Sequence, residues 1–212
     1  MKKHFLHFAA CFAVLLLCAG CKQETTPGEK AGPSGTAETP RQFTNVVAVI
    51  TKLTNTVFWK SVHAGAQQAG KEYGYEIAWS GPNRETNSAL QIQLVDDAIA
   101  RRVAGVVIAP VHRMELVPVV DKLAGLKIPC AIVDSGVETV NFLCFAATAN
   151  YDGGVLAARR MGQTLDGKGN VLVLRHLAGS GATVKRVSGF VDTITNILAN
   201  FASYKISIIF TN

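Results

Sequence analysis

Short apolar runs alternate with amphipathic stretches through most of the chain after residue 45. The runs have the length of buried strands, and the stretches between them have the spacing of helices. The strands of a first set are predicted to begin at Val46, Glu76, Ala104 and Ile128, and a shorter run over 142–147 is expected to add an edge strand. Strands that alternate with helices in this way predict right-handed crossovers and a parallel sheet covered on both faces. The predicted fold class is α/β, a parallel sheet flanked by helices.

A strand, a polar turn and a helix over 46–73 organise this first set. Apolar residues recur every three or four positions along the helix and predict one apolar stripe, made of Phe58, Val62, Ala66, Ala69 and Tyr73. Gly74 is expected to end the helix in the left-handed conformation, which glycine adopts easily. Phe58 and Trp59 point about 100° apart, so at least one ring should face the crevice above the strand end. The alternative is that both rings belong to the core or to a partly exposed cluster.

The next two helices carry similar signals. The second is expected over about 87–102, and its predicted buried stripe is made of Leu94, Val95, Ala98 and Ile99. In the third helix, Pro118 falls within or near the first turn, where the missing amide hydrogen costs little, and Gly125 ends the helix. Each of these helices therefore connects two strands of the predicted sheet.

A second, smaller set of elements follows. Asn150 is expected to cap a helix over 151–165, and a strand over 170–174 comes next. Gly179-Ser180-Gly181 precedes another helix, whose predicted apolar face is made of Val187, Phe190, Ile194 and Ile197. The last predicted strand covers 204–210. Two strands with two helices make a poor lobe on their own, so we expect an incomplete second lobe.

The first 20 residues have the pattern of a secretion signal. Lys2 and Lys3 give a positive start, and the apolar run over 8–17 is too short to span a bilayer as a helix. Cys18-Ala19-Gly20-Cys21 then resembles the lipobox of bacterial lipoproteins, with Cys18 in the place where leucine is usual. We expect Cys21 to carry the lipid, which would anchor the protein to a membrane. The expected location is the periplasm or cell envelope. An ordinary signal peptide is the alternative.

The composition agrees with an exported globular protein. Residues 21–44 are rich in Thr, Glu, Gly, Pro and Ala and have no apolar period, which predicts a flexible tether. The chain is 49% hydrophobic and its net charge is +6, or +4 without Lys2 and Lys3. No basic stripe is interleaved with aromatic residues, so we expect no nucleic-acid partner. Beyond Cys21 only Cys130 and Cys144 remain; a buried thiol pair is expected, although an oxidising compartment would permit a disulfide.

Polar and aromatic side chains follow the predicted strands at their carboxyl ends, where ligands bind in open parallel sheets. They are Lys52, Asn55, Thr56, Phe58, Trp59, Ser80, Asn83, His112, Arg113, Asp134, Ser135, Thr148 and Asn150. Such a rim suits a polyhydroxylated small molecule, whose apolar ring face packs on an aromatic side chain. Asp134 is the strongest candidate, because a carboxylate can accept two hydroxyls; its alternative role is to cap the next turn.

The sequence shows no pattern typical of an enzyme. Gly179-Ser180-Gly181 is not followed by the Lys and Ser or Thr of a P-loop. His63, His112 and His176 lack metal-ligand spacing with cysteines or carboxylates. Neither a Ser-His-Asp set nor a carboxylate pair stands out, although a triad gathered from distant positions stays open. We therefore expect a binding protein without catalytic residues, metal or cofactor.

Four stretches together resemble the periplasmic sugar-binding proteins of ABC transporters, of the ribose-binding type. These stretches are 55–59, 128–134, 148–154 and 179–190, the last with Arg186 and Gly189-Phe190. The resemblance implies two similar α/β lobes joined by a hinge, an N-terminal sugar-binding lobe over 45–148 and a partial C-terminal lobe over 149–212. It also implies that the lobes close on a sugar and that the closed form is presented to a membrane permease.

The resemblance assigns roles by position. Phe58 and Trp59 match the aromatic pair that stacks on the sugar, Asp134 matches a residue that binds its hydroxyls, and Asn55 and Thr56 match the polar pair before the aromatics. Ser135 and, more weakly, Thr183 and Lys185 are further candidates. The family usually has a proline at Val57, an acidic residue at Ala149 and an arginine near Val184, and these three departures argue against ribose itself.

Members of this family continue well beyond the point that matches Asn212, so we expect the chain to be truncated and its sugar affinity to be weak or absent. The predicted function is the lipid-anchored solute-binding component of an importer for a ribose-like sugar. The alternatives are a ligand-sensing subunit for chemotaxis or autoinducer signalling, and an inactive fragment. A lactose-repressor type of regulator is disfavoured, because the signal and the tether replace a helix-turn-helix.

Overall fold

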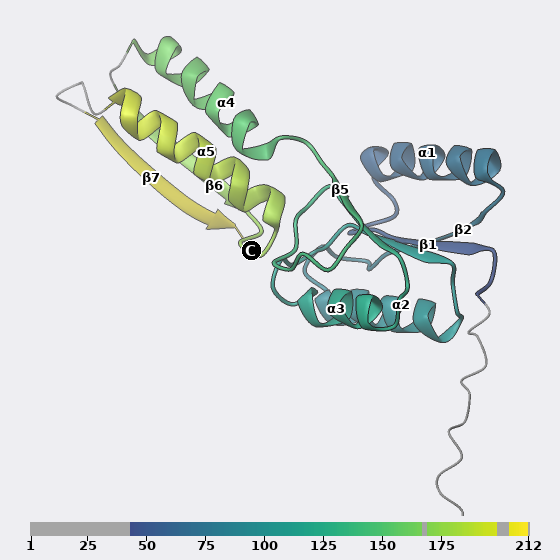
Figure 1. Ribbon diagram of the computed structural model, residues 1–212. Helices are drawn as coiled ribbons and strands as arrows, with labels where there is room; N and C mark the ends of the chain where they lie inside the picture. The colour runs from purple at the N-terminus through teal and green to yellow at the C-terminus, as the bar shows by residue number, and fades with distance from the viewer. Residues whose placement is uncertain (1–42, 167–168, 199–203, 212) are drawn as a thin grey trace, which may run out of the picture. The chain divides into compact units, whose positions relative to one another are not determined.

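The computed structural model describes residues 43–166, 169–198 and 204–211 (Figure 1). The predicted signal over 1–20, the predicted lipid on Cys21 and most of the predicted tether lie outside these residues. Within the described ranges, no helix combines the length and the apolar character that crossing a membrane requires. The described part of the chain contains a five-stranded sheet and a two-stranded sheet, each with its own helices.

The five-stranded sheet is parallel throughout, as the alternation of strands and helices predicted. Its strands are β1 (Val46–Ile50), β2 (Glu76–Ser80), β3 (Gly105–Ile108), β4 (Cys130–Val133) and β5 (Cys144–Ala146), in the spatial order β2-β1-β3-β4-β5. The helices between them are α1 (Val57–Tyr73), α2 (Ser88–Ala100) and α3 (Val117–Gly125). Figure 1 shows α1 on one face of the sheet and α2 with α3 on the other. The predicted fold class is confirmed.

The main core lies between the sheet and the helices α2 and α3, which cover one face of the sheet. Strand residues Ile50, Ile108 and Ile132 are fully buried there, together with Val95 of α2 and Leu123 of α3. Fully burying an aliphatic side chain of this size stabilises the fold by about 1.5–3 kcal/mol. The predicted stripe of α2 is confirmed, since Val95 and Ala98 are buried and Leu94 and Ile99 pack against them.

The predicted apolar stripe of α1 does not face the protein interior. Phe58 and Tyr73 are 56% and 76% exposed, whereas the buried residues of the helix are Trp59 and Gly70. A Cβ on Gly70 would lie 2.7 Å from the side chain of Ile77, so the glycine lets the helix approach β2 closely. The prediction of a single stripe was wrong because the large Trp59 ring and this close approach set the rotation of the helix. Gly74 ends α1 with a left-handed φ of 75°, as predicted.

The two-stranded sheet pairs β6 (Gly169–His176) with β7 (Tyr204–Thr211) in parallel. Its helices are α4 (Asn150–Leu165) and α5 (Gly181–Leu198), and its small core contains Ala158, Val171 and Ile194. Both strands are longer than the apolar runs that predicted them. The division of the chain into lobes at residue 148 stays a prediction.

The two cysteines of the described residues differ in environment. Cys130 is buried in β4, and burial, with a smaller contribution from the neighbouring Cys144, raises the pKa of its thiol to about 12. Cys144 is exposed, because it lies in the edge strand β5, and both thiols are free. The prediction of a buried thiol pair is therefore wrong for Cys144.

Candidate functional site

An ion pair joins the residues that follow β1 and β4. Nζ of Lys52 lies 2.8 Å from Oδ2 of Asp134. Both strands border β3 in the parallel sheet, so their carboxyl ends meet at one edge. Lys52 is only 6% exposed, whereas the side chain of Asp134 keeps 27% of its surface accessible. The carboxylate is therefore the part of this pair that can reach a ligand.

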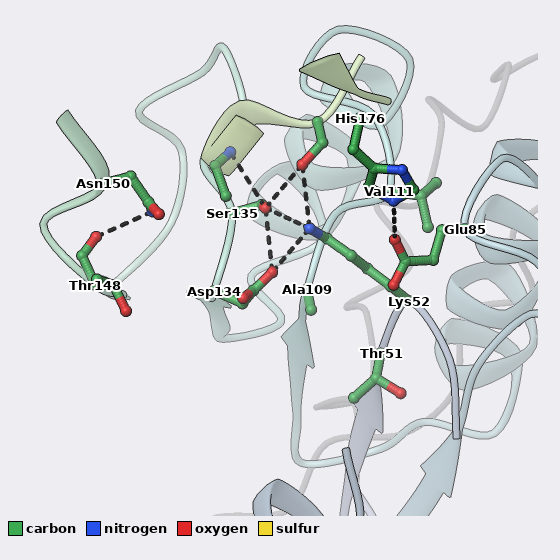
Figure 2. A network of polar contacts seen from close by, with 12 residues as sticks. Thr51, Lys52, Glu85, Ala109, Val111, Asp134, Ser135, Thr148, Asn150 and His176 are labelled. Carbon is green, nitrogen blue, oxygen red and sulfur yellow. Dashed lines mark hydrogen bonds and ion pairs between the residues drawn. The ribbon is translucent and has the colours of Figure 1, made fainter. Parts of the chain in front are cut away.

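Ser135 connects the ion pair to the start of α5. Its hydroxyl accepts a hydrogen bond of 2.5 Å from Lys52 and donates one of 3.1 Å to Oδ2 of Asp134 (Figure 2). The backbone amide of Ala182 donates to the same Ser135 oxygen at 3.4 Å, and Lys52 also donates to Ser180 at 3.3 Å. Ser135 and Ser180 are both buried. The loop after β4 and the beginning of α5 therefore share one polar cluster, made of Lys52, Asp134, Ser135 and Ser180.

The backbone at Asp134 adopts an unusual conformation. Its φ of 63° lies in the left-handed region, which residues other than glycine rarely occupy. The amide of Asp134 donates to the carbonyl of Ala146, and the amide of Ser135 donates to that of Val133. The hydrogen bonds that the structure gives to the Asp134 carboxylate come from the side chains of Lys52 and Ser135. Side-chain pairing, rather than capping of the next turn, therefore accounts for its position.

A buried amide side chain holds the strand ends that carry this cluster. Gln91 of α2 is fully buried and donates to the carbonyls of Thr51, at 3.1 Å, and Ala109, at 2.9 Å. Its Oε1 accepts from the amide of Val111 at 2.9 Å. These three bonds satisfy backbone groups just beyond β1 and β3, where the ladder of the sheet has ended. Gln91 therefore fixes the backbone directly before Lys52.

The predicted aromatic pair lies at the start of α1. The rings of Phe58 and Trp59 are 4.9 Å apart in an edge-to-face arrangement of 77°. Trp59 is only 3% exposed, so Phe58 is the ring that offers an accessible face. Thr56 caps the helix by accepting a hydrogen bond of 3.3 Å from the amide of Trp59, and the neighbouring Asn55 is exposed. The expectation that at least one ring faces the crevice above the strand end stays a prediction, and Phe58 is the exposed ring of the pair.

The predicted site residues therefore fall into separate groups. Asp134 and Ser135 share the polar cluster with Lys52, while Phe58 and Trp59 contact each other. Thr183 lies elsewhere: it lines a cavity of about 380 Å³ formed by α4, α5 and β6, together with Gly154, His176 and Phe190. The assignment of a sugar-binding role to these residues stays a prediction.

A cavity of about 410 Å³ begins directly beside the polar cluster, at Gly136. Its lining includes Phe145, which is half exposed, and Thr148. Arg113 and Glu138, which form an ion pair of 2.9 Å, also line it. An aromatic ring next to hydroxyl and charged groups is the type of lining that binds polar small molecules.

Asn150 does not cap the helix as predicted. The helix α4 begins at Asn150 itself, after Ala149, which provides no side-chain cap. The Asn150 amide group donates to the carbonyl of Thr148 at 3.0 Å, and its Oδ1 accepts from Arg186 at 2.6 Å. Asn150 is buried and joins the start of α4 to α5. The prediction was wrong because this contact with a distant arginine replaces the local cap.

Sequence reasoning placed Lys52 on the rim without a role and missed Gln91. A buried lysine needs an acidic partner, and Asp134 at the end of a neighbouring strand was the available carboxylate. The sequence shows both residues at strand ends, but only the spatial order of the strands brings the two together. Gln91 gives no comparable signal, because a polar residue in an amphipathic helix is usually exposed.

Comparison with known proteins gives consistent results. The family model described as a periplasmic binding protein domain matches residues 47–210. The chain is 32% identical over 178 residues to the D-ribose/D-allose-binding protein of Pseudomonas aeruginosa, covering 80% of this chain and 50% of that protein. It is 26% identical over 176 residues to the ribose import binding protein of Bacillus subtilis, covering 83% and 55%.

Solved structures of solute-binding proteins are similar as well. One from Agrobacterium vitis with bound D-fucose is 34% identical, has a TM-score of 0.69 and covers 76% of this chain and 56% of that one. One from Agrobacterium radiobacter in complex with D-arabinose is 28% identical, has a TM-score of 0.69 and covers 76% and 57%. The chain spans about half the length of these relatives. The resemblance predicted from the motifs is confirmed, and the chain belongs to the periplasmic binding protein domain family.

Proposed function

We propose that this protein binds a small neutral sugar as the solute-binding component of an ABC importer. The observation that carries the proposal is the Asp134 carboxylate, which is held at the carboxyl edge of the sheet and keeps part of its surface accessible. Family membership supports it, since relatives are named for binding ribose, allose or xylitol. These ligands share an uncharged, polyhydroxylated carbon chain, and a carboxylate is a strong acceptor for a hydroxyl.

Two side chains, Asp134 and Phe58, are proposed to contact the sugar. Oδ2 of Asp134 is occupied by Lys52 and Ser135, which leaves Oδ1 to accept a ligand hydroxyl. The exposed ring of Phe58 offers an apolar face on which the carbon–hydrogen face of a sugar packs. The choice among sugars is proposed only as ribose-like, and the substitutions at Val57, Ala149 and Val184 still argue against ribose itself.

The proposal includes export and attachment to the membrane, with a permease as the partner. It rests on the sequence of residues 1–21, with Cys21 as the lipidated residue. Mass spectrometry of the mature protein tests it. We expect an N-terminal Cys21 that carries a diacylglycerol, and an unmodified N-terminus beyond Cys21 would contradict the anchor.

Calorimetric titration of the purified chain with D-allose and D-ribose tests the sugar proposal. We expect weak binding, with a Kd on the order of 1 mM or above, which corresponds to a binding free energy of about −4 kcal/mol or one less negative, because the chain spans about half the length of its relatives. Asp134→Asn and Phe58→Ala should each weaken it. Their matched controls, Asp97→Asn on exposed α2 surface and Tyr73→Ala at the exposed end of α1, should not.

If binding is unchanged in both Asp134→Asn and Phe58→Ala, the sugar binds at a site that includes neither residue. Absence of binding to every neutral pentose and hexose would contradict the proposal as a whole. Submicromolar binding by this chain would contradict the expected weakness.

A further inference from the structure

The amino ends of the five parallel strands lie at one edge of the sheet, opposite the edge that carries Asp134. The strands β1 to β4 have four or five residues each, so the two edges are about 15 Å apart. The described part of the chain begins at the amino edge, at Phe43. The amide of the next residue, Thr44, donates to the carbonyl of Arg102 at 2.8 Å. The turn before β3 therefore lies directly beside the point where the predicted tether joins the sheet.

A loop at this amino edge exposes two apolar side chains. Val140 and Leu143, just before β5, are 86% and 76% exposed. The loop itself is held in place, because the side chains of Thr139 and Asn141 both donate to the Asp121 carboxylate, at 2.6 and 2.9 Å. The exposure of the two apolar side chains is therefore a property of a fixed loop.

The same two side chains line a cavity of about 350 Å³. Most of its lining is apolar and includes Ile128, Pro129 and Phe142. The exposed Lys127 also lines it. Exposed apolar side chains that gather around a hollow with polar residues at its rim are typical of a surface that contacts a partner or a membrane.

The turns around this cavity carry basic side chains. Arg101 and Arg102 precede β3, Lys127 precedes β4, and all three are exposed. The segments 101–104, 126–129 and 139–143 contain no Asp or Glu. The nearest carboxylates in the flanking helices are Asp97, one turn before Arg101, and Asp121, whose oxygen the 139–143 loop engages. Positive charge therefore dominates this part of the edge.

We propose that this amino-edge surface docks on an anionic bilayer. The surface is made of Phe43, Arg101, Arg102, Lys127, Val140 and Leu143. Apolar and aromatic side chains next to basic ones form the combination that binds a membrane with negatively charged headgroups. A second copy of the chain is the less suitable occupant, because a symmetric contact through this surface would bring its cations close to one another.

The position of the predicted tether favours this occupant. Phe43 lies 22 positions after Cys21. A flexible chain of this length has a root-mean-square reach of roughly 25 Å, so a lipid on Cys21 would keep the amino edge close to the bilayer. A weak surface contact is then populated, because its local concentration is high. This step rests on the proposed lipid anchor, whereas the affinity of the surface for lipid does not. Docking through the amino edge directs Asp134 toward the solution.

Paramagnetic relaxation measures which edge faces the lipid. The ¹⁵N-labelled full chain is mixed with nanodiscs of phosphatidylcholine and phosphatidylglycerol that contain a trace of gadolinium-chelating lipid. We expect the amides of Arg102, Lys127 and Leu143 to relax at least about fivefold faster than those of Asp134 and Ser135, because the two edges are about 15 Å apart. Equal relaxation at both edges, faster relaxation at the carboxyl edge, or no enhancement at these amides would overturn the proposal.

Two double variants separate the apolar from the electrostatic contribution. Val140→Ser with Leu143→Ser removes the exposed apolar side chains, and Arg101→Gln with Lys127→Gln removes two charges. Each pair should lower the relaxation enhancement at Arg102 by about threefold or more, since every basic or apolar contact adds to the affinity for the surface. Discs of phosphatidylcholine alone should lower it for the unaltered chain as the charge variant does.

Matched controls use exposed residues outside this surface. Leu156→Ser on α4 and Lys60→Gln on α1 should leave the enhancement unchanged. An enhancement that both double variants retain would overturn the proposal. Amide shifts at Lys127 and Leu143 that change with protein concentration in the absence of lipid would identify a second copy as the occupant and would also overturn it. Since no sugar is present, failure here leaves the proposed sugar binding untouched.

Discussion

A methyl group on Gly154 of α4 would overlap the backbone carbonyl of Arg186 in α5. The two helices therefore touch through backbone at this point, and only glycine leaves the necessary space. Gly189 of α5 makes the reciprocal contact, since a Cβ there would overlap the carbonyl of Tyr151. This pair of contacts explains why glycine stands at 154 and 189, where a helix would otherwise favour alanine.

Gly154→Ala should lower the free energy of unfolding by about 1–3 kcal/mol, because the added methyl forces α4 and α5 apart. Urea denaturation followed by circular dichroism measures the change. Gly153→Ala is the matched control: a Cβ at Gly153 meets nothing within 4 Å, so alanine should be neutral or stabilising by up to about 1 kcal/mol. Equal losses for the two variants would contradict the close contact.

Gln91→Leu should destabilise the protein by at least about 2 kcal/mol, since it leaves the amide of Val111 and the carbonyls of Thr51 and Ala109 without their buried partner. Thermal or urea unfolding measures the loss. Gln93→Leu, at an exposed position of the same helix, should change stability by less than about 0.5 kcal/mol. A mild effect of Gln91→Leu would mean that water or a shifted backbone satisfies these groups.

Alkylation should distinguish the two cysteines of the described residues. The pKa of Cys130 is raised to about 12, so its thiol stays neutral and unreactive from pH 7 to beyond pH 10, and burial shields it further. Cys144 is exposed and should react first with iodoacetamide in the native protein. Peptide mapping by mass spectrometry measures both rates. Comparable rates at pH 8 would contradict the buried environment of Cys130.

Asp121 should contribute to stability at neutral pH and lose that contribution in acid. Hydrogen bonds from Thr139, at 2.6 Å, and Asn141, at 2.9 Å, hold the pKa of its carboxyl below the usual 3.8. The contribution is therefore complete above pH 3.8 and disappears as the pH falls through the lower pKa of the folded state. Thr139→Val should raise this pKa toward its ordinary value, and Thr54→Val, at an exposed site, should not.

Nuclear magnetic resonance titration of the carboxyl carbons measures these pKa values. A pKa of Asp121 that is unchanged in Thr139→Val would show that the hydrogen bond from this threonine has no influence on the carboxyl.

The order of strands and helices could be predicted from the sequence because buried strands and amphipathic helices leave different periods. The stripe of α2 agrees with its 3.6-residue period, since the aliphatic side chains of Val95 and Ala98 are buried in the main core. The rotation of α1 could not be predicted, because it depends on how closely Gly70 approaches Ile77 in space. Periodicity identifies a helix, but tertiary contacts decide which neighbouring residue is buried.

The candidate site could be predicted only in part for a similar reason. Asp134 follows directly after a strand, so its place at the sheet edge could be inferred from local pattern. Its partner Lys52 lies 82 positions away along the chain, and Ser180, which accepts a hydrogen bond from Lys52, lies 46 positions away, so only the fold brings these side chains together. Asn150 shows the opposite error, because a local cap was predicted where Arg186 provides the contact.

We propose that a neutral sugar binds at the carboxyl edge of the five-stranded sheet, on Asp134. Titration of ¹⁵N-labelled protein with D-allose, followed by amide chemical shifts, measures this most directly and detects weak binding. We expect saturable shifts at Asp134, Ser135 and Phe58 that disappear in Asp134→Asn. Shifts confined to other parts of the chain, or no shifts at tens of millimolar D-allose, would contradict it.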